Sequence, residues 1–270
     1  MQTFDLISDI HLEFWIPFIQ NVDRMRSQID SFIDDILPDK PSKVLVIAGD
    51  LGHYNEQNIL MLTSFRRYYE YVLFTFGNHD LYMISTAQRE RYNNSSINRW
   101  GEMKQHASEI PGVFPLDGHL MEIEGVTFGG TGMWYDYSFG IQELGMTKAR
   151  IHELWKRTMN DVNYIIESPI FLQEEEKLVK VFKQCNVVVT HVGPDWSNVL
   201  EKYRIDPITS FFYFDGSKWL SQASGKIWCY GHTHSRNDYA IEGCRLVNNA
   251  LGYPNENPFS KLVSIEIVQV

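Results

Sequence analysis

The sequence has few cysteines, no long apolar run and no excess of positive charge. Only three cysteines occur in 270 residues, and no two of them form a CxxC pair. This small, odd number argues against a disulfide framework and favours a reducing compartment such as the cytoplasm. No apolar stretch approaches the ~18 residues of a membrane-spanning helix, and the chain does not begin with the basic and apolar regions of a secretory signal. We therefore predict a soluble, cytoplasmic protein with no membrane partner.

The chain is acidic, with 24 Lys and Arg against 34 Asp and Glu and a formal charge of −10. It lacks the broad positive field that gathers DNA or RNA along a protein surface. A local basic groove is still compatible with this balance. The charge thus argues against extended nucleic-acid binding without excluding it.

The first part of the chain alternates between strand and helix patterns. Apolar residues at three- and four-residue spacing predict a helix from Val22 to Leu37, which Pro38 ends. A strand from Lys43 to Gly49, a helix from Glu56 to Tyr71 and a further strand follow. Strands and helices joined by short connections are typical of a mostly parallel sheet.

The rest of the chain shows no repeat, low-complexity tract or linker. Its patterns predict a helical stretch (Ile84–Ile110), a hairpin that turns at Glu124-Gly125 (Leu120–Met133), a long helix (Gln142–Ile166), another helix (Leu172–Gln184) and C-terminal strands (Tyr239–Val247 and Lys261–Val268). We predict one domain over residues 1–270, with an insertion at about 133–169 that could form a lid or cap.

Five short apolar strands run directly into side chains that bind metals. These side chains are Asp9 and His11, then Asp50, then Asn78, His79 and Asp80, then His191, and finally His232 and His234. Strands that share an orientation in one buried sheet end at the same edge, where ligands gather. Carboxylate, imidazole and amide groups together suit hard or borderline divalent cations. The sequence therefore predicts a metal site at this edge.

The spacing within these motifs has a physical reason. Residues two apart in an extended chain project to the same side, so Asp9 and His11 can reach one ion. Gly49 precedes Asp50 and lets the backbone turn sharply where the strand ends. A single Asp with two carboxylate oxygens can hold two metals about 3.5–4 Å apart.

In this order, the motifs DxH, GD, GNHD, a strand-end His and GHTH resemble those of the calcineurin-like metallophosphoesterase superfamily. The motifs extend over nearly the whole chain. The resemblance implies an α/β fold, a four-layer αββα sandwich of two mixed β-sheets flanked by helices, with a binuclear metal centre at the C-terminal ends of the strands. It assigns Asp9, His11 and His234 to one metal, Asp50 to the bridge, and Asn78, His191 and His232 to the other metal.

The resemblance also implies a chemistry. Two divalent ions are expected, with manganese favoured and Fe, Zn, Ni, Co or Mg as alternatives. A hydroxide that bridges the metals would attack phosphorus in line. His79 would be the unliganded histidine that protonates the leaving group, and Asp80 would fix the tautomer of His79 and raise its basicity.

His53 is the main candidate outside this set, because it lies three residues after Asp50. It is either a solvated loop histidine or a contact to the substrate phosphate, and the double-strand-break repair nucleases of the superfamily have a histidine at the same offset. The aromatic cluster 134–137 is interpreted as core or pocket rim, with a stacking platform for substrate as the alternative. We interpret His106, His119 and His152 as surface or helix histidines.

Taken together, these features predict a metal-dependent phosphoric ester hydrolase. A phosphodiester or a small nucleotide-like compound is the favoured substrate. The net negative charge does not argue against small phosphates, because two bound cations would reverse the local charge. A DNA or RNA nuclease of the same superfamily is the alternative, and a non-catalytic scaffold relative is a third hypothesis. Neither the substrate nor the oligomeric state follows from the sequence.

Overall fold

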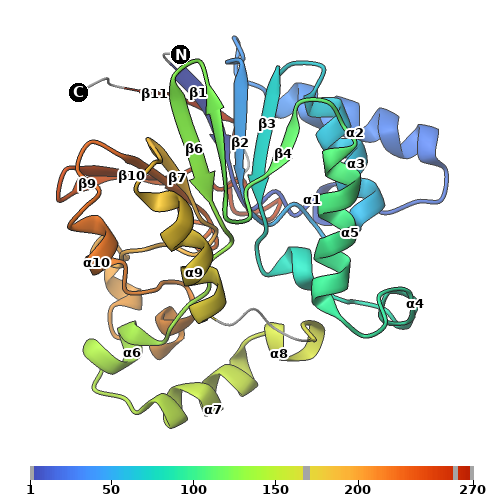
Figure 1. The fold of residues 1–270 in the computed structure, drawn as a ribbon. Helices are drawn as coiled ribbons and strands as arrows, with labels where there is room; N and C mark the ends of the chain where they lie inside the picture. Colours follow the sequence, from blue (N-terminus) through green and yellow to red (C-terminus); the bar gives the residue numbers. More distant parts are fainter. Residues whose placement is uncertain (1–2, 167–170, 258–260, 268–270) are drawn as a thin grey trace.

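Two β-sheets pack face to face, and helices cover their outer faces (Figure 1). This computed structural model describes residues 3–166, 171–257 and 261–267. The five-stranded sheet has the order β11-β1-β2-β3-β4, and the six-stranded sheet has the order β5-β6-β7-β8-β10-β9. Both sheets are mixed, so the expected αββα sandwich is confirmed.

In the first sheet, β1 to β4 are parallel and β11 pairs with β1 in the antiparallel direction. Its strands are β1 (Thr3–Ile7), β2 (Val44–Ala48), β3 (Tyr71–Thr75), β4 (Val113–Pro115) and β11 (Val263–Glu266). The predicted last strand therefore exists, although its final residue, Val268, lies outside the described residues.

In the second sheet, a parallel core carries an antiparallel hairpin at each edge. Its strands are β5 (His119–Ile123), β6 (Val126–Gly130), β7 (Val187–Val189), β8 (Ile227–Tyr230), β9 (Asn237–Ile241) and β10 (Cys244–Asn248). The predicted hairpin around Glu124-Gly125 is confirmed, with Met121 opposite Phe128. The single β stretch predicted for 239–247 is instead the second hairpin, which turns at Glu242-Gly243.

The core follows from the alternation of side chains along each strand. In β2, Val44 and Val46 face the other sheet, whereas Leu45 and Ile47 face the helices. All four side chains are fully buried, as expected for a parallel strand that is covered on both faces. The sandwich therefore has one core between the sheets and others under the helices.

Helix α2 (Val22–Ile36) forms as predicted, and α3 (Asn55–Phe65) ends six residues before the predicted Tyr71. Arg66 ends α3, and its guanidinium donates to the carbonyl groups of Tyr69 and Pro111. Tyr71 then pairs with Val44 as the first residue of β3. Strand pairing thus overrides a helical pattern that continues through this segment.

The remaining helical predictions are correct in outline, but each stretch that was predicted as continuous is divided into shorter helices. The 84–110 stretch contains α4 (Thr86–Arg91) and α5 (Ser96–Ser108), and the 142–166 stretch overlaps α6 (Ser138–Gln142), α7 (Lys148–Thr158) and α8 (Asp161–Tyr164). Gly145 has a φ of +61° and Met159 is extended, so the predicted long helix is broken on both sides of α7. Residues 167–169 of the predicted insertion lie outside the described residues.

Shorter elements complete the fold. They are α1 (Leu12–Trp15), α9 (Phe171–Phe182), α10 (Ser217–Leu220) and the 3₁₀ turns η1 (His79–Leu81), η2 (Glu201–Tyr203) and η3 (Pro207–Phe211). Helix α9 covers the second sheet, and α6 to α8 lie below both sheets, on the side where the parallel strands end (Figure 1). Among the helices that the structure describes, none is both long and apolar enough to cross a bilayer.

Candidate metal centre

The parallel strands of both sheets deliver their polar side chains to one place. Asp9, Asp50, His191 and His232 each lie two residues beyond the end of a strand, and Asn78 lies three residues beyond β3. These side chains are at most 5% exposed. The structure thus brings together the seven residues that the sequence analysis assigned to metals.

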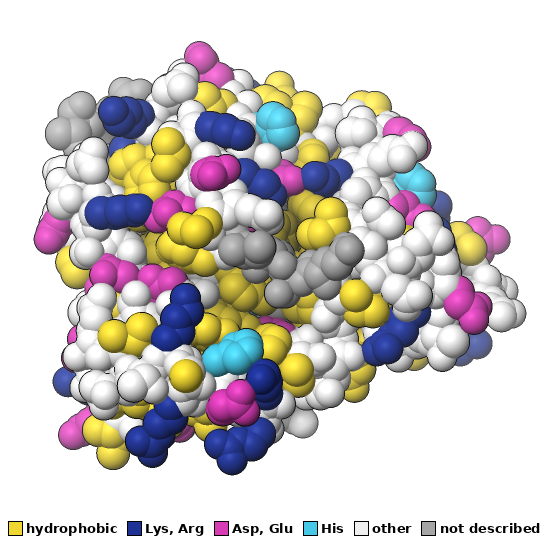
Figure 2. Space-filling view, turned by 60° about the horizontal axis from the view of Figure 1, so that its bottom comes forward, with side chains coloured by type: hydrophobic (Ala, Val, Ile, Leu, Met, Phe, Trp, Pro, Cys, Tyr) yellow, Lys and Arg dark blue, Asp and Glu magenta, His cyan; other side chains and the backbone are white. Residues whose placement is uncertain are grey.

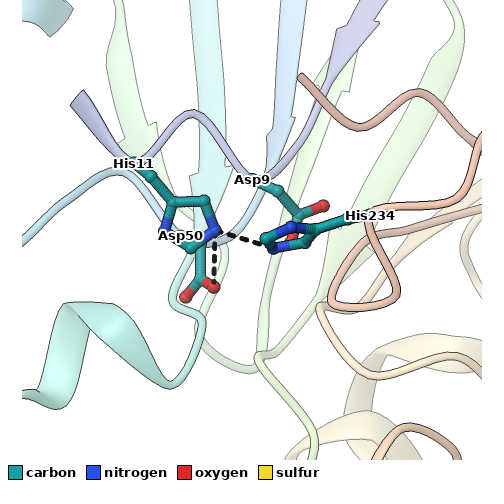
Figure 3. A group of neighbouring side chains, drawn as sticks. All are labelled: Asp9, His11, Asp50 and His234. Atoms are coloured by element: carbon teal, nitrogen blue, oxygen red, sulfur yellow. Dashed lines mark hydrogen bonds and ion pairs between the residues drawn. The ribbon is translucent and has the colours of Figure 1, made fainter. Parts of the chain in front are cut away.

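The first cluster consists of Asp9, His11, Asp50 and His234, each of which offers one donor atom within 4.8 Å of the others (Figure 3). The His11 Nε2 atom lies 2.9 Å from His234 Nε2 and 3.5 Å from Asp50 Oδ2. His234 Nε2 also lies 3.6 Å from Asp9 Oδ1. Two imidazoles and two carboxylates therefore point at one small volume.

The second cluster contains Asp50, His191 and His232. His191 Nε2 lies 3.4 Å from Asp50 Oδ2 and 3.3 Å from Asn78 Oδ1. Asp50 Oδ2 is thus near an imidazole nitrogen of each cluster. This is the arrangement that a carboxylate shared by two metals requires.

In three of the histidines, one ring nitrogen already has a hydrogen-bond partner outside the clusters. His191 Nδ1 bonds to the carbonyl oxygen of Ala48, His232 Nε2 to that of Phe211, and His234 Nδ1 to the carboxylate of Glu256. The other ring nitrogen of each histidine is left for the cluster. Such outer contacts orient metal-binding imidazoles and set their tautomers.

Two glycines make room for the ligands. A Cβ at Gly49 would lie 2.7 Å from the His191 ring carbon Cγ, and Gly49 also has a φ of +85°. A Cβ at Gly77 would lie 2.7 Å from the Asp50 Cγ atom. Both motif glycines are therefore needed because another residue's ligand side chain occupies the place of their Cβ.

The backbone is also unusual here. Asp9, His11, Asp50, His232 and His234 all have φ values between +46° and +69°. Left-handed conformations are uncommon for residues other than glycine and cluster at functional sites. The tight turns after each strand hold these ligand side chains at the sheet edge.

The electrostatics of the cluster favour added positive charge. Burial raises the pKa of Asp9 and lowers the pKa of His232 to about 3. Burial would also raise the pKa of Asp50, but the neighbouring His191, His79 and His11 hold it well below its usual range. Although burial opposes it, Asp50 raises the pKa of His191 to about 9. A proton on His191 thus balances a buried carboxylate, and a divalent cation would replace that proton.

These observations show that the residues fit two divalent ions. Buried oxygen and nitrogen donors converge, a carboxylate lies between two clusters, and the outer ring nitrogens are fixed. Asp9, His11 and His234 would hold one ion, Asn78, His191 and His232 the other, and Asp50 both. Mixed imidazole, carboxylate and amide donors suit Mn, Fe, Zn, Ni or Co.

The Asn78 amide is oriented by Asp161, which the sequence analysis missed. Asn78 Nδ2 donates to Asp161 Oδ1 at 2.9 Å, and Tyr82 and Tyr135 donate to the same carboxylate. Asp161 is fully buried at the start of α8. Because Nδ2 is bound there, Oδ1 faces His191 and the second cluster. Nothing in the local sequence around Asp161 signals this contact.

The structure corrects the role expected of Asp80. Its carboxylate accepts hydrogen bonds from four backbone amides, those of Asp50, Leu51, Gly52 and Gly77. The His79 ring bonds to His53 instead, through a 2.9 Å contact between His79 Nδ1 and His53 Nε2. Asp80 therefore anchors the loop that carries Asp50 and does not set the tautomer of His79.

The sequence analysis also missed Glu13. Its Oε1 atom lies 3.1 Å from His53 Nδ1, and its Oε2 atom accepts a hydrogen bond from the His53 backbone. Both ring nitrogens of His53 thus face other side chains, and a contact of His53 with a substrate phosphate stays a prediction. Glu13 lies two residues after His11, and this spacing was the one available signal.

The aromatic cluster is mainly core, because Trp134 and Tyr135 are 6% and 3% exposed. The Tyr135 ring lies parallel to His232, with their centroids 6.4 Å apart, so it also backs the second metal cluster. His119 and His152 are exposed and His106 is partly buried on α5, and none of the three reaches the clusters.

The fold and site define a class: an αββα sandwich with side chains that can bind metal ions beyond the ends of its parallel strands. A family model for calcineurin-like phosphoesterases matches residues 3–236. The chain belongs to this family.

Several solved structures are similar to this chain in their fold. The crystal structure of a phosphopantetheinyl hydrolase (PptH) from Mycobacterium tuberculosis is similar over 97% of this chain and 95% of that chain, with a TM-score of 0.71 and 19% identity. This likeness supports the fold. A second structure, 11% identical, has a TM-score of only 0.49. No curated protein matches the sequence.

Proposed function

We propose that this protein hydrolyses a phosphate ester with two divalent metal ions, and that its substrate is a phosphodiester or a small nucleotide-like compound. The observation that carries the proposal is the Asp50 carboxylate, which lies between two buried donor clusters. Two divalent ions held by these residues would lower the pKa of a water molecule and neutralise charge on the phosphate.

The clusters open into a cavity of about 330 Å³. Asp50, His79 and His232 line this cavity, and so do residues 158–160, at the end of α7 and in its connection to α8. A phosphoryl group bound at the clusters would therefore lie beside His79. The participation of residues 158–160 supports the proposal that the 133–169 insertion caps the site.

His79 is the proposed proton donor to the leaving oxygen. Its Nδ1 atom is bound to His53, so Nε2 is the ring nitrogen left to carry a proton toward the substrate. Proton transfer of this kind typically contributes about 10²–10⁴-fold to the rate.

A larger cavity of about 730 Å³ adjoins the first, and both are lined by Phe212, Thr233, His234 and Glu256. This space supports a substrate with a second arm, as in a diester. A phosphopantetheinyl ester, which the name of the similar hydrolase suggests, is one candidate for such an arm.

Nuclease activity is the second candidate function, and the charge distribution argues against it. Acidic and basic side chains are interspersed on the face in Figure 2, which shows no continuous basic stripe. The whole chain carries a charge of −10. A nuclease that binds along DNA would show a KM that rises steeply with salt concentration; we expect a KM with little salt dependence.

The experiment uses bis-p-nitrophenyl phosphate as the substrate. We expect turnover with Mn²⁺, loss of activity with EDTA and its return when Mn²⁺ is added back. His79→Ala should lower kcat about 10²–10⁴-fold for diphenyl phosphate, whose leaving group needs a proton, with a smaller loss for bis-p-nitrophenyl phosphate and an unchanged metal content. His119→Ala, at an exposed residue outside the site, should leave kcat for both substrates unchanged. Absence of turnover with every divalent metal tested would instead favour the scaffold hypothesis.

A substrate screen follows from the same proposal. It compares monoesters, cyclic nucleotides, dinucleoside polyphosphates, phosphopantetheinyl esters and oligonucleotides. Preferential turnover of small diesters is expected, and a preference for oligonucleotides would support the nuclease.

The buried, unpaired cysteines Cys185, Cys229 and Cys244 support the proposed reducing compartment.

A further inference from the structure

We infer that Glu13 is a positioning residue of the catalytic site: through His53, it holds the His79 ring in the orientation and tautomer that present Nε2 to the leaving group. This inference rests on the proposed function, since it assigns His79 the proton transfer. Asp80 bonds to backbone amides and not to the His79 ring, so another group must orient His79.

Glu13 holds His53 at two points. The Glu13 Oε1 atom lies 3.1 Å from His53 Nδ1, and Oε2 accepts the His53 backbone N–H at 3.0 Å. The two side chains are only 8% and 10% exposed. One carboxylate thus restrains both the backbone and the ring of His53.

His53 in turn holds His79. The bond from His53 Nε2 to His79 Nδ1 is 2.9 Å long, and the two rings are nearly parallel, with centroids 5.0 Å apart. Tyr82 stacks on both rings, 4.3 Å from His79 and 5.5 Å from His53 between centroids. The His79 ring therefore has little freedom to turn.

The position of Glu13 sets the protonation pattern of the two imidazoles. A carboxylate attracts a proton, so Glu13 Oε1, 3.1 Å from His53 Nδ1, favours the His53 tautomer that carries its proton on Nδ1 and offers the Nε2 lone pair to His79. His79 must then place a proton on Nδ1. As the acid it is an imidazolium, so it carries a second proton on Nε2, gives that proton to the leaving oxygen and keeps the Nδ1 proton bonded to His53. Loss of a partner that orients a functional imidazole through its second ring nitrogen typically lowers activity about 10–100-fold.

Burial makes a purely structural role for Glu13 costly. Within the described ranges, Glu13 has no Lys or Arg ion pair, and His53 is its only partner of that kind. A buried carboxylate without a cationic partner destabilises a fold, whereas a polar side chain that packs without charge would not. Besides the two clusters, Glu13, His11 and His79 form a third group whose donor atoms lie within 4.8 Å of one another. The test must therefore distinguish positioning of His79 from direct metal binding by Glu13.

The test compares two diesters of similar shape, bis-p-nitrophenyl phosphate and diphenyl phosphate, on the manganese-loaded enzyme. Nitrophenolate leaves as a stable anion, whereas phenolate needs the proton. For Glu13→Gln we expect kcat for diphenyl phosphate to fall about 10–100-fold with little change in KM, and a much smaller loss for bis-p-nitrophenyl phosphate. Glu174→Gln is the matched control, because Glu174 is a buried glutamate of α9 outside the site. Glu174→Gln should leave kcat at the wild-type value for both diesters.

Two further readouts do not depend on turnover. Nitrogen-15 NMR of the imidazoles should show His53 protonated at Nδ1 in the wild type and a mixture of tautomers in Glu13→Gln. Metal analysis should show two ions per chain in the wild type and in Glu13→Gln.

In the turnover assay, His53→Gln should reproduce the leaving-group effect. The variant with both Glu13→Gln and His53→Gln should show no further loss of kcat, because the two residues act as one unit.

The inference is overturned by an equal loss with both diesters, by no loss, by additive losses in the double variant or by loss of a metal from Glu13→Gln. Failure of the wild type to hydrolyse either diester would overturn the proposed function instead, while the NMR result would still decide whether Glu13 sets the tautomer of His53.

Discussion

Replacing Gly77 by Ala tests whether the clusters depend on the close packing of Asp50. Gly77 belongs to the GNHD motif, and its φ does not lie in the left-handed region, so Ala is allowed there by backbone conformation. A Cβ at this position would lie 2.7 Å from both the Cγ and the backbone nitrogen of Asp50. The substitution is therefore a steric perturbation of one carboxylate.

The size of the effect follows from these distances. Real Cβ atoms essentially never lie within 3.0 Å of another heavy atom, so the Asp50 backbone nitrogen must separate from the new Cβ by at least 3.0 − 2.7 = 0.3 Å, and the nearer Oδ1 atom must separate by more. Rotation of the side chain cannot relieve the clash, because the Asp50 backbone is equally close. Metal sites tolerate changes of only about 0.2 Å in ligand distance, and a misplacement of 1 Å can cost roughly 10²-fold in rate. We expect weakened binding of both ions and a loss of about 10²-fold in kcat/KM.

The assay combines metal analysis after dialysis, manganese titration by calorimetry and turnover of bis-p-nitrophenyl phosphate. Gly101→Ala is the matched control, because Gly101 lies in α5 with nothing within 4 Å of the added Cβ. It should keep both ions and gain up to about 1 kcal/mol of stability from the higher helix propensity of Ala. Two tightly bound ions and wild-type kcat/KM in Gly77→Ala would refute the steric argument.

Two further predictions concern Asp161 and Asp117. Asp161→Ala should remove the acceptor of the Asn78 amide and weaken binding of one ion about 10–100-fold in a manganese titration, whereas Asp136→Ala, whose partners are Ser138 and Asp215, should not; equal affinities would exclude an orienting role. Asp117 is 8% exposed and bonds to Lys104 and Lys177, which hold its pKa below 3.8 against the effect of burial. Asp117→Asn should therefore lower the free energy of unfolding by about 2 kcal/mol at neutral pH. Because the folded pKa is depressed, this difference should be full above about pH 4 and vanish as the pH falls through the folded pKa; a difference that persists in acid would contradict the ion-pair explanation.

The ligand set could be predicted because each motif couples a strand to its ligand within a few residues. Val44 to Ala48 can only be a buried strand, and Gly49-Asp50 can only follow its end. Element boundaries were harder to predict. The helical pattern after Glu56 continues to Tyr71, but pairing of β3 with β2 stops α3 at Phe65.

The groups behind the ligands could not be predicted for a different reason. Asp161 is 83 residues from the amide that it orients, and Glu13 is 40 residues from the His53 backbone that it holds. Asp80 illustrates the same limit, because its neighbour in sequence is His79 whereas its partners in space are the amides of residues 50–52 and 77.

The amino-acid order alone thus determined the side chains that can bind metals, since strand periodicity and the turn that follows it are local properties, and the resemblance of these motifs to a known family implied the sandwich. Only folding decided which carboxylate supports which ligand, which histidine faces a substrate and what forms the cavity wall. Those relations join residues from separate strands and loops, and they exist only when both sheets have packed together.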